Sequence, residues 1–152
     1  MATPWVTVSA AALNHTKAAA IVAALRSAAK AQGQSDPVDA MIADTVAEIR
    51  LALQSGGVHG DGEAADTVPP SLLRMACRLV IWEAKGRLEM DREFDELDHR
   101  EDLRRLALMR EGKYAVETPE SESGEMASGG SSAEVVQSRS RDATRQKLSG
   151  LL

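Results

Sequence analysis

Glu96 and His99 have the spacing most suggestive of chemistry, because Glu-x-x-His on a helix is the motif of carboxylate-bridged di-iron bundles. Such a site needs the motif on two helices. The other two histidines, His15 and His59, have no glutamate three residues before them. His59 also lies in a polar, glycine-containing stretch without a second His or Cys close by, so its spacing does not match a zinc site. We therefore predict no metal site.

The acidic residues between Asp91 and Asp102 raise a second possibility, a paired general acid and base. Arginines alternate with these acids, which favours a solvated or salt-bridged helix face instead; they are Arg92, Arg100, Arg104 and Arg105. The single cysteine, Cys77, has apolar neighbours and is predicted to be a buried, inert thiol. The sequence contains no nucleophile elbow, P-loop or dinucleotide-binding motif. We expect no enzymatic activity, no catalytic residue and no cofactor.

The composition of the 152-residue chain is typical of an α-helical protein, with 43% hydrophobic but only 3% aromatic residues. A net charge of −5 argues against general nucleic-acid binding through phosphate neutralisation. We recognise no secretory signal, and the apolar runs are far shorter than the ~20 residues of a membrane span. We expect one domain with an appendage, made in a reducing cytoplasm and without a membrane partner.

The stretch from Val68 to Leu72 contains two prolines and is typical of a helix start. Proline fixes φ near a helical value, and an early helix position has no N–H partner to lose. The apolar residues that follow form two adjacent stripes at helical spacing. They predict a central helix from about Pro69 to Arg87 with other helices packed around it.

Three cations lie on one face of this central helix, four and seven residues apart: Arg74, Arg78 and Lys85. They are either a solubilising stripe or a contact surface for an acidic partner or subunit. Trp5 is a further candidate contact residue. It belongs to a short β-prone segment, residues 1–8, which we expect to be an extended arm whose ring docks on a helix or on a neighbouring subunit.

Three more helices are predicted around the central one. The first is an alanine-rich helix that ends near Ala31; Ser9 is its candidate cap, and Asn14 or Thr16 is the alternative start. It is loosely anchored because alanine buries little surface. The second starts at Asp36-Pro37 and has a regular apolar face. The last covers Met90–Glu111, either unbroken or broken near Asp91, and ends before Gly112. We therefore predict an all-α fold, a small antiparallel helical bundle of about four helices over residues 9–114.

Residues 115–152 differ completely in composition, with eight serines, four glycines and no aromatic residue. Such a segment cannot repay the entropy of ordering itself. We expect a C-terminal arm that acquires structure on an adjacent subunit or another protein. Its basic and apolar end supplies the candidate partner-binding residues, which are Arg139, Arg141, Arg145, Lys147, Leu148, Leu151 and Leu152.

Taken in order, four blocks of this chain resemble the small head–tail adaptor (head-completion, connector) proteins of tailed bacteriophages and related gene-transfer particles. The resemblance covers Trp5 to Tyr114. The blocks are Trp5-Val6-Thr7; Asp36-Pro37 with Ile42-Ala43-Asp44 and Glu48-Ile49-Arg50; Val68-Pro69-Pro70-Ser71-Leu72 with Arg74, Ala76 and Trp82; and Arg100-Glu101-Asp102-Leu103 leading to Glu111-Gly112-Lys113.

The resemblance implies a structural role in the virion. Such proteins form a ring, usually dodecameric, beneath the portal after DNA packaging and present a surface to the next neck or tail component, a stopper or tail-terminator protein. Their C-terminal arms often clasp the portal. Genomic DNA would pass through the lumen without specific binding, and mild negative charge suits such a conduit. Residues 89–101 are a candidate lumen lining.

Two other classes of function remain as alternatives. A DNA-binding packaging factor, such as a small terminase subunit, requires a basic recognition helix, and Leu72–Trp82 is too apolar to lie in a DNA groove. A helical enzyme subunit requires a pocket with convergent polar groups, which the sequence does not indicate.

Overall fold

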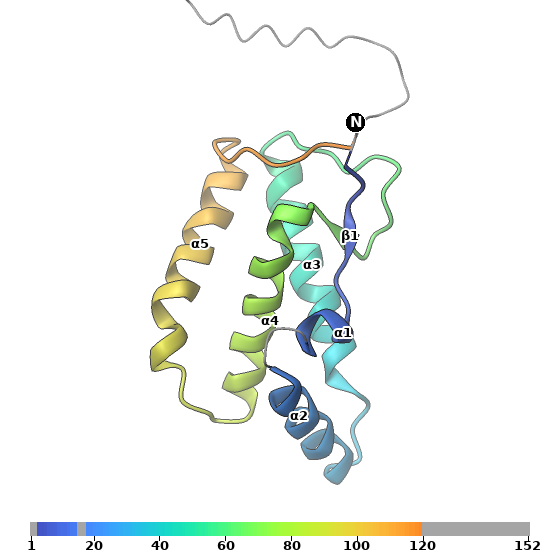
Figure 1. The fold of residues 1–152 in the computed structure, drawn as a ribbon, viewed down its shortest axis with the longest axis vertical. Helices are drawn as coiled ribbons and strands as arrows, with labels where there is room; N and C mark the ends of the chain where they lie inside the picture. Colours follow the sequence, from blue (N-terminus) through green and yellow to red (C-terminus); the bar gives the residue numbers. More distant parts are fainter. Residues whose placement is uncertain (1–2, 15–17, 120–152) are drawn as a thin grey trace, which may run out of the picture. The chain divides into compact units, whose positions relative to one another are not determined.

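The computed structural model describes residues 3–14 and 18–119, which all belong to the first of two units into which the chain divides, residues 1–122 and 123–152. Its elements follow one another as shown in Figure 1. They are β1 (Val6–Thr7), α1 (Ala10–Leu13), α2 (Ala19–Ala31), α3 (Pro37–Ser55), β2 (Thr67–Val68), the short 3-10 helix η2 (Pro70–Leu72), α4 (Leu73–Arg87), the 3-10 helix η3 (Glu93–Asp95) and α5 (Glu96–Arg110). The described unit is therefore predominantly helical, as predicted.

Helix α3 begins where the sequence predicted. Asp36 caps it, since a carboxylate oxygen of Asp36 accepts a 2.9 Å hydrogen bond from the Val38 N–H. Pro37 occupies the first helical position. One face of α3 is buried, and its large apolar side chains are Val38, Met41, Ile42, Val46, Ile49 and Leu53. This face packs against both α4 and α5.

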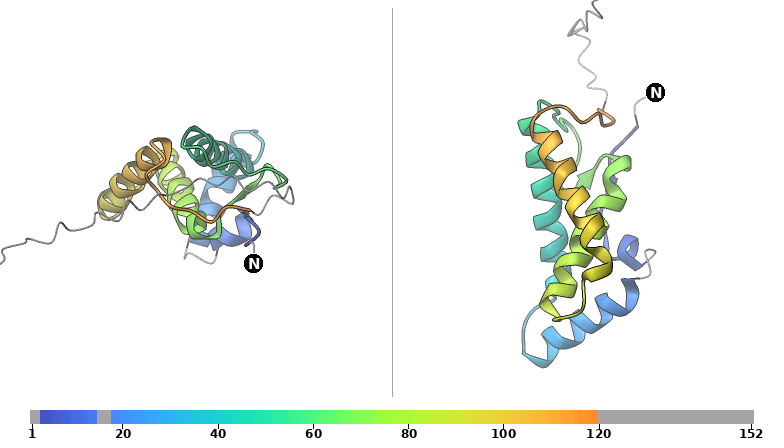
Figure 2. Two further views of the ribbon diagram at one scale, coloured as in Figure 1. Left: turned by 90° about the horizontal axis from the view of Figure 1, so that it is seen from above. Right: turned by 90° about the vertical axis from the view of Figure 1, so that its left-hand side faces the viewer.

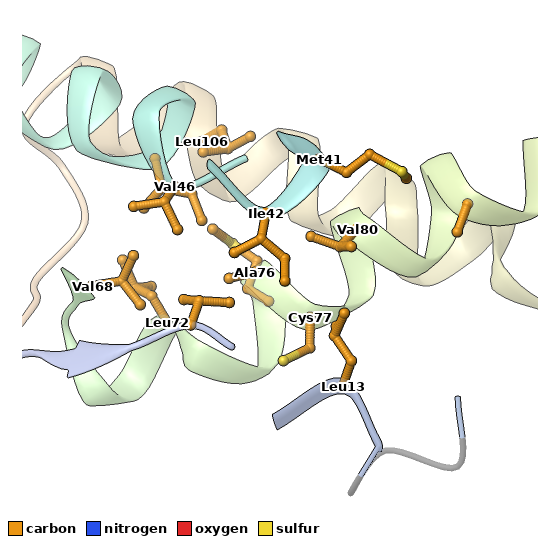
Figure 3. Packing of buried hydrophobic residues seen from close by; sticks show 14 of the residues in the cluster. Leu13, Met41, Ile42, Val46, Val68, Leu72, Ala76, Cys77, Val80 and Leu106 are labelled. Carbon is orange, nitrogen blue, oxygen red and sulfur yellow. The ribbon is translucent and has the colours of Figure 1, made fainter. Parts of the chain in front are cut away.

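Helix α4 is the central helix of the described unit. Val68 lies outside it, in β2, as expected for a residue before proline. α4 contacts α1, α2, α3 and α5, so its wide apolar surface is covered on several sides. Figure 3 shows Ala76 and Val80 of α4 in the buried cluster with Ile42 of α3. Cys77 is 2% exposed, which confirms the prediction of a buried thiol.

The two-stranded sheet was not predicted. β1 and β2 pair antiparallel, with Val6 opposite Val68 and Thr7 opposite Thr67. The Val8 N–H also donates to the Asp66 carbonyl at 3.3 Å. The N-terminal segment is thus extended, as expected, but it is fixed to the stretch that leads into α4. Two-residue strands sixty residues apart leave no periodic signal in the sequence.

The first predicted helix is divided in two, and the last begins beyond Asp91, which agrees with the expected alternative of a break there. Ser9 caps α1, which ends at Leu13, and α2 begins only at Ala19, so the predicted first helix is two helices. The predicted helix from Met90 starts later, with η3 leading into α5. Gly112 has φ of +68°, the left-handed conformation predicted for the end of this helix.

Helices α3, α4 and α5 lie side by side in every view (Figures 1 and 2). All three helices contribute buried side chains to one apolar cluster, among them Ile49 of α3, Val80 of α4 and Leu106 of α5. Among the described residues, no helix combines the length and apolarity that crossing a membrane requires.

Candidate functional site

Arg78, a predicted partner-contact residue, is engaged within the chain. Its Nε lies 2.7 Å from Oδ2 of Asp102 on α5, and its Nη2 bonds the other carboxylate oxygen. Asp102 is completely buried. This bidentate hydrogen bonding raises the pKa of the Arg78 guanidinium, although burial opposes it. Arg78 therefore joins α4 to α5 and is not free to bind an acidic partner.

Lys85 is engaged in the same way. Its Nζ forms a close ion pair with Oδ2 of Asp95 in η3, and only 19% of the Lys85 side chain is exposed. Arg74 is exposed and forms no ion pair within the part of the chain that the structure describes. The predicted stripe of three cations thus leaves Arg74 alone available to a partner. Spacing placed the three residues on one helix, but it could not reveal the acids opposite two of them.

Trp5 contacts its own domain. The ring is 6% exposed, and the Arg50 guanidinium carbon lies 5.0 Å from its centroid. Gly60 approaches the ring so closely that a Cβ there would lie 2.5 Å from Cζ3. The indole Nε1 donates a 3.2 Å hydrogen bond to the Glu117 carbonyl. Of the two expected positions for the Trp5 ring, a helix or a neighbouring subunit, the structure shows the first, since Arg50 belongs to α3.

The segment after α5 continues along the body further than the predicted boundary at residue 114. Tyr114 and Val116 pack against the core cluster. The Ser71 hydroxyl donates a 2.5 Å hydrogen bond to Oε2 of Glu117, which lowers the pKa of this carboxyl. The described body therefore includes residues 115–119. The predicted arm residues lie outside the described residues: Arg139, Arg141, Arg145, Lys147, Leu148, Leu151 and Leu152.

A pocket of about 220 Å³ opens between α2, α4 and α5, lined in part by Ile21, Ile81, Trp82, Asp95, Asp98 and His99. The Trp82 and His99 rings stack with centroids 4.1 Å apart and an interplanar angle of 9°. The Arg92 guanidinium carbon lies 4.5 Å from the Trp82 ring centroid. Arg78 and Lys85 also reach the pocket wall, each beside its own acid. The pocket therefore combines aromatic rings with both carboxylates and cations, and the Trp82 ring already has a cationic partner in Arg92.

Burial lowers the pKa of His99, and Arg92 lowers it further, while Asp102 acts in the opposite direction. His99 Nδ1 is buried without a hydrogen-bond partner. The Glu96–His99 spacing drew attention to this histidine, but its partner in the structure is Trp82, not a metal ligand. Within residues 3–14 and 18–119, no three side chains of the types His, Cys, Asp and Glu lie close enough together to hold a metal ion.

The turn between α4 and α5 carries an exposed surface that sequence reasoning did not identify, which we call the α5 corner. Its apolar residues are Met90, Phe94 and Leu97, exposed by 44%, 93% and 74%. The buried face of α5 contains Asp102, Leu106 and Met109. On a helix, positions three or four residues apart share a face, so this buried face continues towards the N-terminus through His99 and Asp95. Phe94 and Leu97 are not on it, and the spacing of the buried residues could therefore have predicted that both lie outside the core.

The site with the strongest potential for binding is therefore this corner and the adjoining pocket, where apolar, aromatic and acidic groups come together. Its composition is suited to binding another protein rather than to acid–base catalysis. Comparisons of the chain with family models, curated proteins and solved structures find no match.

Proposed function

We propose that this chain is a head–tail adaptor of a tailed bacteriophage or a gene-transfer particle. Copies of it form a ring beneath the portal after DNA packaging and provide the attachment surface for the next neck or tail protein. DNA passes through the lumen without specific binding. In this proposal the helices pack as an antiparallel bundle, and the protein is made in the host cytoplasm and resides in the virion neck.

One observation carries the proposal: the four blocks that resemble the adaptor family are distant in sequence but belong to one packed unit. Val6 of the first block pairs with Val68 of the third. The second block begins α3, whose buried face packs against α4 and α5, the helices that carry the third and fourth blocks. Blocks that together build one body are expected to meet in this way, so their packing supports the proposal.

Two structural features also support it. The α5 corner exposes large apolar side chains, as a protein that works in an assembly would. A ring requires head-to-tail contacts, in which two different surfaces of each subunit meet. The exposed Arg74 face of α4 and the acidic α5 corner differ in charge and chemistry, as such a pair of surfaces would.

The test is deletion of residues 133–152. In the proposal, the basic end of the arm docks on the portal or on an adjacent subunit, so the shortened protein should fold but fail to attach to portal-bearing heads. Normal attachment by the shortened protein would refute this role for the arm. Electron microscopy of particles containing the full chain should show a ring between portal and tail.

A salt-dependent DNA-binding assay separates the proposal from a small terminase subunit. A terminase-like protein would bind duplex DNA with an affinity that falls steeply as salt rises. An adaptor with this acidic surface should show no such binding at physiological salt.

A further inference from the structure

The α5 corner exposes apolar side chains of unusual size for a surface. Phe94 is the only phenylalanine in the chain, and it is the most exposed of the large hydrophobic residues described. Leu97 lies three residues later, and η3 leads directly into α5, so the two side chains are neighbours on one face. Three large apolar side chains within eight residues form a patch rather than isolated exposed residues.

The same surface is strongly acidic. Residues 89–102 contain eight acidic and two basic residues, a formal charge of −6 with histidine neutral. Four of these carboxylates form ion pairs, namely Asp95, Glu96, Glu101 and Asp102. The other four form no ion pair within the described part of the chain: Glu89, Asp91, Glu93 and Asp98. The corner therefore has a net negative charge around its apolar patch, with four of its described carboxylates outside close ion pairs.

The pocket beside the corner adds a specific feature. Asp98 lines it together with the stacked rings of Trp82 and His99. The His99 ring stacks on Trp82 and the Arg92 guanidinium lies over the same indole, so the group there that is suited to an incoming guanidinium is the Asp98 carboxylate. The surface as a whole thus fits a partner segment that is basic and carries large aliphatic side chains.

We propose that the C-terminal segment of this same chain, residues 139–152, binds the α5 corner of a copy of this protein. Residues 139–148 contain four basic and one acidic residue, a formal charge of +3. Three leucines, at positions 148, 151 and 152, provide the aliphatic groups. Charge and apolarity are therefore complementary on both sides, with arginines facing the unpaired acids and leucines covering Phe94 and Leu97.

The length of the connection allows this. Residues 120–138 are nineteen residues and span up to about 65 Å when extended. Helix α5 has fifteen residues and is about 22 Å long. The segment is therefore long enough to extend from Pro119 to the corner of a neighbouring copy. Several such contacts act together in an assembly of copies, so individually weak surface contacts suffice.

The test uses the full chain with a nitroxide label on Ala143→Cys. Cys77 is 2% exposed, so the introduced thiol is the one that reacts under native conditions. At 50 mM salt, the amide NMR signals of residues 90–98 should lose more than half their intensity, while those of Ala52 and Leu53 in buried α3 should not. The loss should disappear at 500 mM salt, because screening weakens contacts between exposed charges.

Two matched triple variants test whether the contact depends on the acidic side chains of the corner. The corner variant Asp91→Asn/Glu93→Gln/Asp98→Asn should increase the intensity of the amide signals of residues 90–98 in the labelled protein at least twofold. The control Asp39→Asn/Asp44→Asn/Asp61→Asn removes three exposed acids elsewhere and should restore nothing. Circular dichroism checks that each variant is folded, and all six substitutions are at exposed positions.

Signals at the corner that keep full intensity at low salt would overturn the proposal, as would an effect unchanged in the corner triple variant. Mixing labelled protein with isotope-enriched unlabelled protein tests the contact between copies. The corner signals of the enriched copy should lose intensity, and a loss seen only when the label and the isotope are on the same chain would also overturn the proposal. The outcome is independent of the neck function, because attachment to portal-bearing heads is a separate measurement.

Discussion

Arg78 and Asp102 form a bidentate ion pair in which the carboxylate is completely buried and about a third of the guanidinium side chain is exposed. The pair joins α4 to α5. Arg105 provides a second, longer contact, with Nη1 3.6 Å from Oδ1 of Asp102. The buried charge of Asp102 therefore depends on cations from both helices.

The first prediction concerns this pair. Arg78→Met should lower the free energy of unfolding by about 2–3 kcal/mol, because it leaves Asp102 charged, buried and only weakly paired. The double variant Arg78→Met/Asp102→Leu should recover most of the loss, since it removes the buried charge as well. Urea denaturation followed by circular dichroism measures both. A double variant less stable than Arg78→Met would show that the pair itself, not the orphaned charge, supplies the stability.

The second prediction concerns the contact between the ends of α3 and α5. A Cβ on Gly56 would collide with the Met109 carbonyl oxygen, a backbone atom that cannot rotate away. Gly56→Ala should therefore force the helix ends apart and cost at least about 2 kcal/mol. Gly33→Ala is the control, because a Cβ at Gly33 would meet no atom within 4 Å. The only expected cost is the strain of an alanine at a φ of +72°, which lowers the free energy of unfolding by about 1 kcal/mol. If both variants lost the same free energy of unfolding, the predicted collision at Gly56 would be contradicted.

The third prediction tests the packing of Gly60 against Trp5. Gly60→Ala should destabilise the protein by about 1–3 kcal/mol, because its Cβ would lie 2.5 Å from the indole ring. In a Trp5→Leu background, the same substitution should cost much less, since the ring that it collides with is gone. A double-mutant cycle measures this coupling. Additive effects would mean that the ring moves freely out of the way.

The fourth prediction concerns pH. Because burial lowers the pKa of His99 in the folded protein, the unfolded chain takes up the proton first as the pH falls. The free energy of unfolding should therefore decrease from a pH of about 6.5 down through the lowered folded-state pKa. His99→Gln should flatten this part of the curve, and His59→Gln, at an exposed position, is the control. An identical slope in wild type and His99→Gln would refute the assignment.

The fifth prediction concerns Cys77. Burial raises the pKa of its thiol more than Arg78 lowers it, and the residue is 2% exposed. Its reaction with a disulfide reagent at pH 8 should be roughly 100-fold slower in the folded protein than in urea. A rate close to that of the unfolded chain would show that α4 opens readily.

Sequence reasoning succeeded where the signal was local. Asp36 with Pro37 predicted the start of α3, and Gly112 predicted the end of α5. The two prolines predicted a helical start near Pro69, and Pro70 begins the 3-10 helix η2, after which α4 starts at Leu73. Each depends on residues within one helical turn of each other. The signals that fix a cap or a turn are of this kind.

Contacts between distant residues were not predictable in the same way. Nothing near Arg78 in the sequence indicates Asp102, twenty-four residues later. The pairing of Val6 with Val68 and the burial of Trp5 also depend on long-range packing. The exposure of Phe94, by contrast, agrees with the local periodicity of the buried residues Asp102, Leu106 and Met109.

The hydrogen bond from Trp5 to Glu117 spans 112 residues of sequence. During synthesis on the ribosome, this hydrogen bond can form only after nearly the whole body has been translated, because its acceptor is the carbonyl of Glu117. β1 likewise stays unpaired until β2 has left the exit tunnel. The amino-terminal strand is therefore made first but secured among the last, and a nascent chain interrupted before residue 117 leaves that end of the body open.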